Sequence, residues 1–248
     1  MTRLKRRRIL FRERMLFWMI GYPTYCVGAL IYGLLRVTGR IRIRHPERWP
    51  YGKGKVIIAP NHPSLWEPMV CMLLSPWEGL LHPTRMVPWS TPDAGNYDRW
   101  YWVLARSRFV FVPRGQPRGE VQALAKVVRL LRIGSRVIIF PEGGRTHKGV
   151  KFHYSKSRKH RVRELKNGLA RAACDSGATI VTVWIDGADR VLPAGSVIPL
   201  LWRRITITIG EPIKVPRTFL KGDERTRHVA AKTQEVRGRL LALAEEED

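Results

Sequence analysis

The sequence predicts an α/β fold: a mixed, mostly parallel sheet flanked by helices, with an N-terminal membrane-associated helical hairpin. Three observations predict it. Short apolar or alternating runs of strand length recur along the chain, and segments with a helical apolar stripe separate them, as in a sheet covered on both faces. A long uncharged segment at residues 15–35 precedes them. At 248 residues the chain is long enough for one such domain with a real core.

The uncharged segment at residues 15–35 predicts a membrane anchor. Its length suffices for a membrane-spanning helix, which needs roughly 20 apolar residues. Gly21, Tyr22 and Pro23 interrupt it near the middle, and proline favours a break because it lacks a backbone donor. Arginine and lysine flank both ends, so the positive-inside rule places both flanks in the cytoplasm; these residues are Arg3, Lys5, Arg6, Arg7, Arg8, Arg12, Arg14, Arg36, Arg40, Arg42, Arg44 and Arg48.

We therefore predict that residues 1–40 form a re-entrant or in-plane helical hairpin on the cytoplasmic face of the inner membrane. Basic residues beside an apolar segment also favour anionic lipids. A single membrane span and a helix pair packed within the protein are the alternatives. Residues 41–248 form the second predicted domain.

The strands and helices of residues 41–248 follow from periodicity. Ile41 and Ile43 alternate with arginines, and residues 204–209 alternate in the same way, which is typical of half-exposed strands. Strands are expected at residues 41–44, 56–60, 85–88, 109–112, 136–140, 179–185 and 204–209. Helices are expected from Pro68 to Leu73 and at residues 119–133, 164–175 and 224–244. Residues 148–163 are long and strongly basic, which fits either a solvated loop or a lip that contacts phosphates or membrane.

The charge of the chain indicates which classes of partner it attracts. The 45 Lys and Arg against 20 Asp and Glu give a net charge of +25, which attracts nucleic acid, an anionic membrane, or phosphorylated substrates. No recognisable nucleic-acid-binding motif is present, so no nucleic-acid partner is expected. The three cysteines are far apart and match neither a disulfide framework nor a metal-binding pattern, so no metal site is predicted.

A histidine and a carboxylate follow the apolar run at residues 56–60. His62 comes two residues after that run and Glu67 five residues later. Histidine titrates near neutrality and accepts a proton from a hydroxyl when it is held in one tautomer. A carboxylate on the far ring nitrogen holds it so. The pair predicts a general base, His62, oriented by Glu67, although Glu67 also fits as a partner of the helix dipole.

Two further apolar runs end in charged residues. Arg114 follows residues 109–112, and an arginine fork suits phosphate. Residues 136–140 are followed, after Pro141, by Glu142, Gly143, Gly144 and Arg145. The glycine pair lets backbone amides approach a ligand closely. Glu142 and Arg145 fit either substrate binding or an ion pair with each other.

In this order the motifs resemble those of the glycerophospholipid acyltransferases, which include the 1-acylglycerol-3-phosphate acyltransferases. Asn61-His62 with Glu67 resembles the family's Asn-His-x4-Asp motif. Residues 109–114 resemble a second block that ends in a phosphate-binding arginine. Residues 140–146 are similar to the family's Phe-Pro-Glu-Gly-Thr-Arg-Ser block, and Lys166 begins a Lys-x-Gly. The likeness covers about residues 41–213.

The resemblance implies an acyltransferase domain at residues 41–248 that needs no cofactor. Its donor would be an acyl thioester, acyl-CoA or acyl carrier protein, and its acceptor a lipid, most directly 1-acylglycerol-3-phosphate. The substrate-binding residues it implies are Asn61, Arg114, Glu142, Gly143, Gly144, Arg145 and Lys166. A glycolipid or amino-lipid acceptor, and a basic membrane- or nucleic-acid-binding protein without catalysis, are the alternatives.

The chain departs from the family pattern at four places. Glu67 stands where the family has Asp, Gly144 where it has Thr, and Thr182 where it has Pro. The segment at residues 148–163 also makes the gap after the third block long. These departures concern the identity of the acceptor more than the chemistry.

Overall fold

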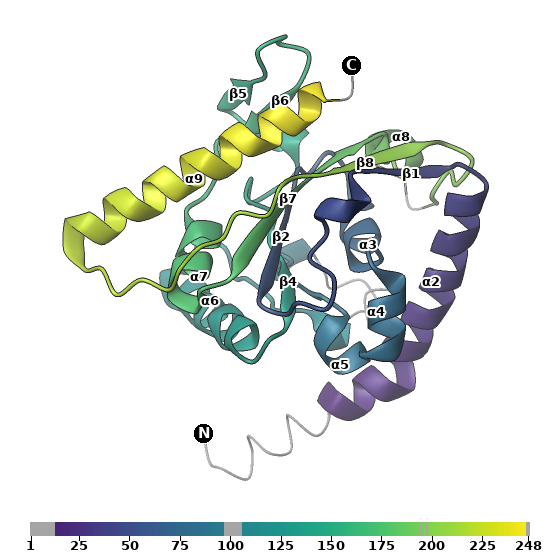
Figure 1. The fold of residues 1–248 in the computed structure, drawn as a ribbon, viewed down its shortest axis with the longest axis horizontal. Coiled ribbons are helices and arrows are strands. Elements are labelled where there is room, and N and C mark those ends of the chain that lie inside the picture. Colours follow the sequence, from purple (N-terminus) through teal and green to yellow (C-terminus); the bar gives the residue numbers. More distant parts are fainter. Residues whose placement is uncertain (1–12, 97–105, 194, 197, 247–248) are drawn as a thin grey trace.

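A six-stranded sheet forms the centre of the molecule (Figure 1). The computed structural model describes residues 13–96, 106–193, 195–196 and 198–246. The sheet consists of β1 (Ile41–Arg44), β2 (Val56–Pro60), β3 (Trp89–Ser90), β4 (Arg136–Ile138), β7 (Thr179–Asp186) and β8 (Ile205–Ile209). Its helices are α2 (Tyr22–Val37), α3 (Glu67–Met72), α4 (Pro76–Leu81), α5 (Pro83–Met86), α6 (Pro117–Arg132), α7 (Gly168–Ser176), α8 (Ala188–Val191) and α9 (Gly222–Glu245).

The strand order is β1-β8-β7-β2-β4-β3. Strands β7, β2, β4 and β3 run parallel to one another, and β8 runs antiparallel to β7 while pairing in parallel with β1. The predicted mixed, mostly parallel sheet is therefore confirmed. Because β2 and β4 are parallel neighbours, their carboxyl ends open at the same edge of the sheet.

Helices cover both faces of the sheet. In β2, Ile57 and Ala59 belong to the core cluster on the side of α6, α7 and α9, whereas Val56 and Ile58 belong to the cluster on the side of α2 and α3. Figure 1 shows the same two layers. A strand buried on both sides reads as a continuous apolar run, which explains the sequence of β2.

Three predicted elements differ from the structure. Residues 85–88 were expected as a strand, but Pro83 begins helix α5 and the strand follows at Trp89–Ser90. Residues 109–112 form only isolated parallel bridges, Phe109 with Ser90 and Val112 with Asp93. The segment at residues 148–163 is no plain loop, because β5 (Phe152–Tyr154) and β6 (Arg161–Arg163) pair as an antiparallel hairpin.

The predicted N-terminal hairpin is wrong over the described residues, where Glu13–Val37 form one continuous helix of 25 residues. Phe17–Gly21 make a π-helical turn, in which the N–H of Tyr22 bonds to the Phe17 carbonyl. Pro23 therefore falls in the first turn of α2, where its missing N–H costs little. The basic residues that precede the helix, up to Arg12, lie outside the described residues.

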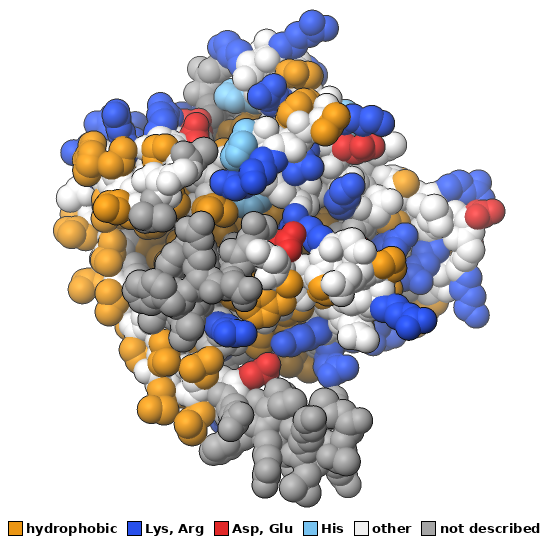
Figure 2. Space-filling view, turned by 180° about the vertical axis from the view of Figure 1, so that it is seen from behind, with side chains coloured by type: hydrophobic (Ala, Val, Ile, Leu, Met, Phe, Trp, Pro, Cys, Tyr) orange, Lys and Arg blue, Asp and Glu red, His pale blue; other side chains and the backbone are white. Residues whose placement is uncertain are grey.

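One face of this helix packs on the domain and the other is exposed. Tyr25 and Tyr32 are buried, and the Tyr22 hydroxyl donates to the Leu80 carbonyl at 2.9 Å. Gly79 permits the close approach of α4, since a Cβ there would lie 2.1 Å from the Tyr25 hydroxyl oxygen. The outer face is apolar and exposed at Met15, Trp18, Met19, Val27, Leu30, Ile31, Leu34 and Val37, and Trp77 and Leu81 of α4 are exposed as well. Figure 2 shows hydrophobic side chains gathered along one edge of the molecule.

Candidate active site

His62 and Glu67 lie just beyond the carboxyl end of β2 and form the centre of the candidate site. Strand pairing carries β2 to Pro60, and Glu67 is the first residue of α3. The His62 Nδ1 and Glu67 Oε2 atoms are 3.0 Å apart. Glu67 is fully buried, whereas a small part of the His62 side chain remains exposed. The predicted pair therefore exists, with the carboxylate on the inner side of the ring.

The second oxygen of Glu67 is held by Ser64. Both the backbone N–H and the hydroxyl of Ser64 donate to Glu67 Oε1, each at 2.8 Å. With three donors around it, the carboxylate has little freedom to turn away from the ring. Because a carboxylate accepts at Nδ1, the proton belongs on that nitrogen and the lone pair on Nε2.

The ring of His62 stacks on the ring of Phe140. Their centroids lie 4.1 Å apart with the planes inclined by 28°. No hydrogen bond from the described parts of the chain occupies Nε2. An imidazole that is stacked on one face, bonded at Nδ1 and free at Nε2 is oriented to take a proton from an incoming hydroxyl.

Glu142 ties the turn after β4 to His62. Its Oε1 accepts from the His62 backbone N–H at 2.9 Å and from the Thr146 hydroxyl at 3.0 Å, and its Oε2 accepts from the Arg163 N–H at 2.9 Å. Burial raises the pKa of this carboxyl group, and the three donors oppose that rise. The Thr146 N–H also donates to the His62 carbonyl at 2.8 Å. The two strand ends therefore form one rigid unit.

Glu142 and Asn61, two of the residues predicted to bind substrate, are both hydrogen-bonded within the protein. Glu142 is fully buried, and it forms no ion pair with Arg145 in the described structure. The Asn61 side-chain amide donates to the Ile185 carbonyl at 3.0 Å and accepts from the Ile185 N–H at 2.8 Å. Asn61 thus extends the pairing of β2 with β7 beyond the strand. Both residues therefore hold the strand ends that carry the site, and their contact with a substrate stays a prediction.

Two cationic side chains lie close to Gly143 and Gly144. The Arg114 Nη1 atom lies 3.4 Å from where a Cβ of Gly144 would be, and Lys166 Cγ lies 3.1 Å from the corresponding point of Gly143. Asp93 pairs with Arg114 through Nε at 3.3 Å, and 39 % of the Arg114 side chain is exposed. Gly143 has a φ of 67°, which favours glycine. Arg114 and Lys166 therefore both lie beside the turn that contains Gly143 and Gly144.

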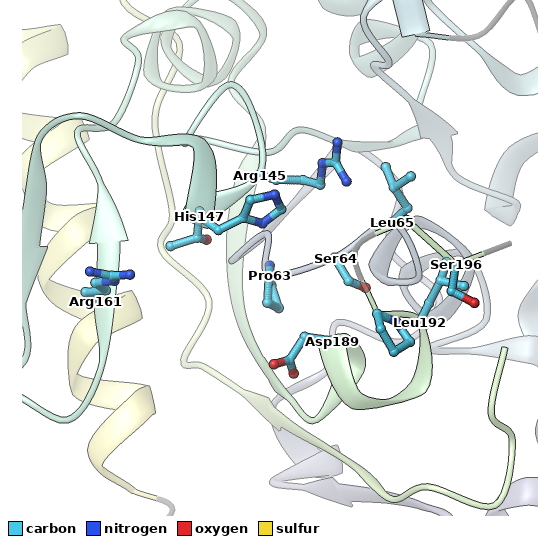
Figure 3. A pocket seen from close by; sticks show the side chains of 12 residues that line it. Pro63, Ser64, Leu65, Arg145, His147, Arg161, Asp189, Leu192 and Ser196 are labelled. Atoms are coloured by element: carbon cyan, nitrogen blue, oxygen red, sulfur yellow. The ribbon is translucent and has the colours of Figure 1, made fainter. Parts of the chain in front are cut away.

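A cavity of about 390 Å³ begins at Pro63, the residue after His62, and His62 itself is not part of its lining. It is lined by Pro63, Ser64, Leu65, Arg145, Thr146, His147, Arg161, Asp189, Leu192, Pro193, Gly195 and Ser196. Figure 3 shows Arg145 and His147 on one side of it and Asp189 on the other. Arg145 thus faces the cavity rather than Glu142.

Several residues that shape the site were not predicted, namely Ser64, Asp93, Phe140, Thr146 and Arg163. Three of them, Ser64, Phe140 and Thr146, lie within the quoted motifs, so their proximity to the site was visible in the sequence. Their contacts were not, because they depend on how the strand ends face one another.

Comparison with known proteins agrees with this geometry. The Acyltransferase family model matches residues 35–186. The chain is 25 % identical over 174 residues to the chloroplastic 1-acyl-sn-glycerol-3-phosphate acyltransferase LPAT1 of Arabidopsis thaliana, covering 70 % of this chain and 44 % of that protein. It is 26 % identical over 129 residues to the chloroplastic 1-acyl-sn-glycerol-3-phosphate acyltransferase BAT2 of Brassica napus, covering 52 % of this chain and 34 % of that protein. The chain therefore spans less than half the length of these curated relatives.

A solved structure shares the fold. The crystal structure of the 1-acyl-sn-glycerophosphate (LPA) acyltransferase PlsC from Thermotoga maritima matches with a TM-score of 0.55 at 19 % identity, covering 85 % of this chain and 73 % of that one. The family model itself spans more than half of the sequence and includes both strand ends of the site. On that match, the chain belongs to the acyltransferase family.

Proposed function

We propose that this chain transfers a fatty acyl group from an acyl thioester to a hydroxyl of a lysophospholipid, most directly 1-acylglycerol-3-phosphate. The observation that carries the proposal is the His62–Glu67 pair, with Nδ1 bonded to the carboxylate at 3.0 Å and Nε2 unoccupied by the described residues. The printed names of the curated relatives support the same substrate class.

The proposed reaction needs no covalent acyl-enzyme. The acceptor hydroxyl oxygen attacks the thioester carbonyl carbon while its proton passes to His62 Nε2. Glu67 stabilises the imidazolium that forms. The tetrahedral intermediate then collapses, the C–S bond breaks, and the imidazolium returns the proton to the leaving sulfur. The products are an ester and a free thiol.

The turn after β4 supplies a candidate oxyanion donor. The Gly143 N–H donates a hydrogen bond to the Phe140 carbonyl at 3.0 Å, whereas the Gly144 N–H has no hydrogen-bond partner among the described residues. A fixed backbone donor of this kind stabilises developing negative charge without reorganising. We assign this role to Gly144.

Arg114, with Arg145 and Lys166, would bind the anionic groups of the substrates. Both acyl-CoA and acyl carrier protein are anionic donors, and the acceptor carries a phosphate. The net charge of +25 therefore favours the encounter with all of them.

Replacing Arg114 with alanine should raise KM for 1-acylglycerol-3-phosphate by about tenfold or more and change kcat little, because a charge-assisted contact to phosphate is lost. The measurement is steady-state acyl transfer at varied acceptor concentration. Arg118→Ala removes the same charge from an exposed position on α6 and serves as the control. An Arg114→Ala enzyme with unchanged KM would point to a neutral acceptor and against the phosphate assignment.

The outer face of the N-terminal helix is proposed to lie in the cytoplasmic face of the inner membrane. Its exposed apolar side chains, together with Trp77 and Leu81, lie on the outside of the molecule. The opposite face of the helix packs on the domain, where the Tyr22 hydroxyl donates to the Leu80 carbonyl. Trp and Leu on one face of a helix are typical of interfacial binding. The packed inner face favours an in-plane helix over a free membrane span.

Leu30→Asp with Leu34→Asp should weaken binding to vesicles of anionic phospholipid by more than about tenfold, since burying each leucine contributes roughly 1.5–3 kcal/mol. The two side chains are 76 % and 64 % exposed. Vesicle flotation measures the bound fraction. The control is Val121→Asp with Ile133→Asp, which changes two equally exposed apolar residues at the α6 side of the sheet. Equal flotation of the two double variants would exclude this surface.

A further inference from the structure

The side chain of Arg163 occupies space that two glycines leave open. Its Nη1 atom lies 2.6 Å from where a Cβ of Gly144 would be, and its Cγ atom lies 2.6 Å from the corresponding point of Gly149. Any larger residue at either position would have to displace Arg163. The Arg163 side chain therefore packs against Gly149 and Gly144, and its guanidinium lies at the turn that follows β4.

Strand pairing and a hydrogen bond hold the backbone of Arg163 in place. Arg163 is the last residue of β6, and its Cα pairs with that of Phe152 in the β5–β6 hairpin. The neighbouring Val162 is fully buried in the main core. The Arg163 N–H donates to Glu142 Oε2 at 2.9 Å. The hairpin thus anchors the backbone of this arginine to the same buried carboxylate that holds the backbone of His62.

Two guanidinium groups face the same point at Gly144. Arg114 Nη1 lies 3.4 Å from the same Cβ position that Arg163 Nη1 approaches to 2.6 Å. Asp93 neutralises Arg114 through Nε, but no carboxylate in the described parts of the chain lies within ion-pair distance of Arg163. Its guanidinium has one weak protein contact, from Nη1 to the Arg145 carbonyl at 3.5 Å. Like charges held this close are unfavourable unless an anion lies between them.

We propose that Arg163 and Arg114 form a two-arginine site that binds the phosphate monoester of the acceptor across Gly144. The inference deepens the proposed function and rests on it. A dianionic phosphate offers oxygens to both forks at once, and arginine forks suit phosphate geometry. A neutral head group offers no anionic oxygen to either fork.

This site explains two departures from the family pattern together. The family's threonine at position 144 would place its Cβ against Arg163 Nη1, so Gly144 is the residue that admits Arg163. The basic segment at residues 148–163, which lengthens the gap after the third block, is the hairpin that carries Arg163. The glycine and the hairpin are therefore two parts of one device.

The test measures binding of sn-glycerol 3-phosphate to the full chain by calorimetry, together with KM for 1-acylglycerol-3-phosphate. Arg163→Ala should weaken both by about tenfold or more, as expected for a lost charge-assisted bond, and Arg163→Lys should recover part of the loss. Lys156→Ala removes a positive charge from an exposed position in the same hairpin and should leave both unchanged. Glycerol, which has no phosphate, should not bind any of them detectably.

Gly144→Ala provides a second, independent variant. Its new methyl group would meet Arg163 Nη1 at 2.6 Å and Arg114 Nη1 only at 3.4 Å, so it displaces Arg163 selectively. Its effect should resemble that of Arg163→Ala, and the double variant should be no weaker than either single one, because coupled residues are not additive. Fully additive losses would contradict the coupling.

The outcomes separate this inference from the proposed reaction. Unchanged binding of sn-glycerol 3-phosphate in Arg163→Ala, or no binding by the wild type, would overturn the two-arginine site even if acyl transfer occurs. Binding that depends on Arg163 in a chain that transfers no acyl group would support the site and disprove the proposed reaction.

Discussion

Replacing His62 with alanine is expected to reduce kcat/KM for acyl transfer by on the order of 10²- to 10⁴-fold, the usual contribution of a positioned general base. Without the imidazole no group at the end of β2 accepts the hydroxyl proton. The measurement is ester formation from an acyl thioester and 1-acylglycerol-3-phosphate. Thermal unfolding of the same preparation shows whether the loss is chemical, since His62 lies at the edge of the core and only its ring is removed.

A second histidine nearby provides a matched control for the loss of an imidazole ring. His147 lines the cavity beside Arg145 but has no carboxylate partner among the described residues. His147→Ala should retain turnover within about tenfold, as expected for a side chain that contributes binding alone. Substantial turnover by a folded His62→Ala protein would refute the base assignment.

Replacing Glu142 with alanine should destabilise the protein and abolish activity together. The change leaves three donors without an acceptor: the His62 N–H, the Thr146 hydroxyl and the Arg163 N–H. An unsatisfied buried donor costs about 1–3 kcal/mol, so a loss of several kcal/mol in the free energy of unfolding is expected. Urea unfolding measures it, and acyl transfer by the folded fraction shows whether the site has lost its geometry.

Glu142→Gln should cause a smaller change of the same kind. Glutamine keeps one oxygen but turns an amide toward one of the donors, so its loss of stability should be smaller than that of alanine. Glu164→Gln changes an exposed carboxylate in the same segment and should alter stability by less than about 0.5 kcal/mol. If Glu142→Ala were as stable as Glu164→Gln, the proposed link between the two strand ends would be wrong.

The two strands whose ends carry the site could be predicted from the sequence, because the signals for them are local. Val56–Pro60 and the run beginning at Arg136 are continuous apolar segments followed at once by polar residues. In the structure the two strands are parallel neighbours, which present their carboxyl ends at one edge of the sheet. A hydrogen bond from the His62 N–H to Glu142 Oε1 joins the two strand ends there.

Tertiary contacts decided the features that local patterns missed. Gly21, Tyr22 and Pro23 predict a break, but a π-helical turn places the proline where its missing donor matters little. Asn61 belongs to a catalytic motif in sequence, yet both ends of its amide pair with Ile185, 124 residues away. Arg163 reaches the site only because a hairpin folds back onto Glu142, and nothing in its own neighbourhood of the chain indicates that.

The account depends on deprotonation of an acceptor hydroxyl by His62 during direct transfer from a thioester. The decisive measurement follows free thiol release from acyl-CoA and from acyl carrier protein by the full chain, with and without 1-acylglycerol-3-phosphate. We expect release with at least one donor only when the acceptor is present, one thiol for each ester formed. Release at the same rate without acceptor, or none from either donor with it, would contradict the account.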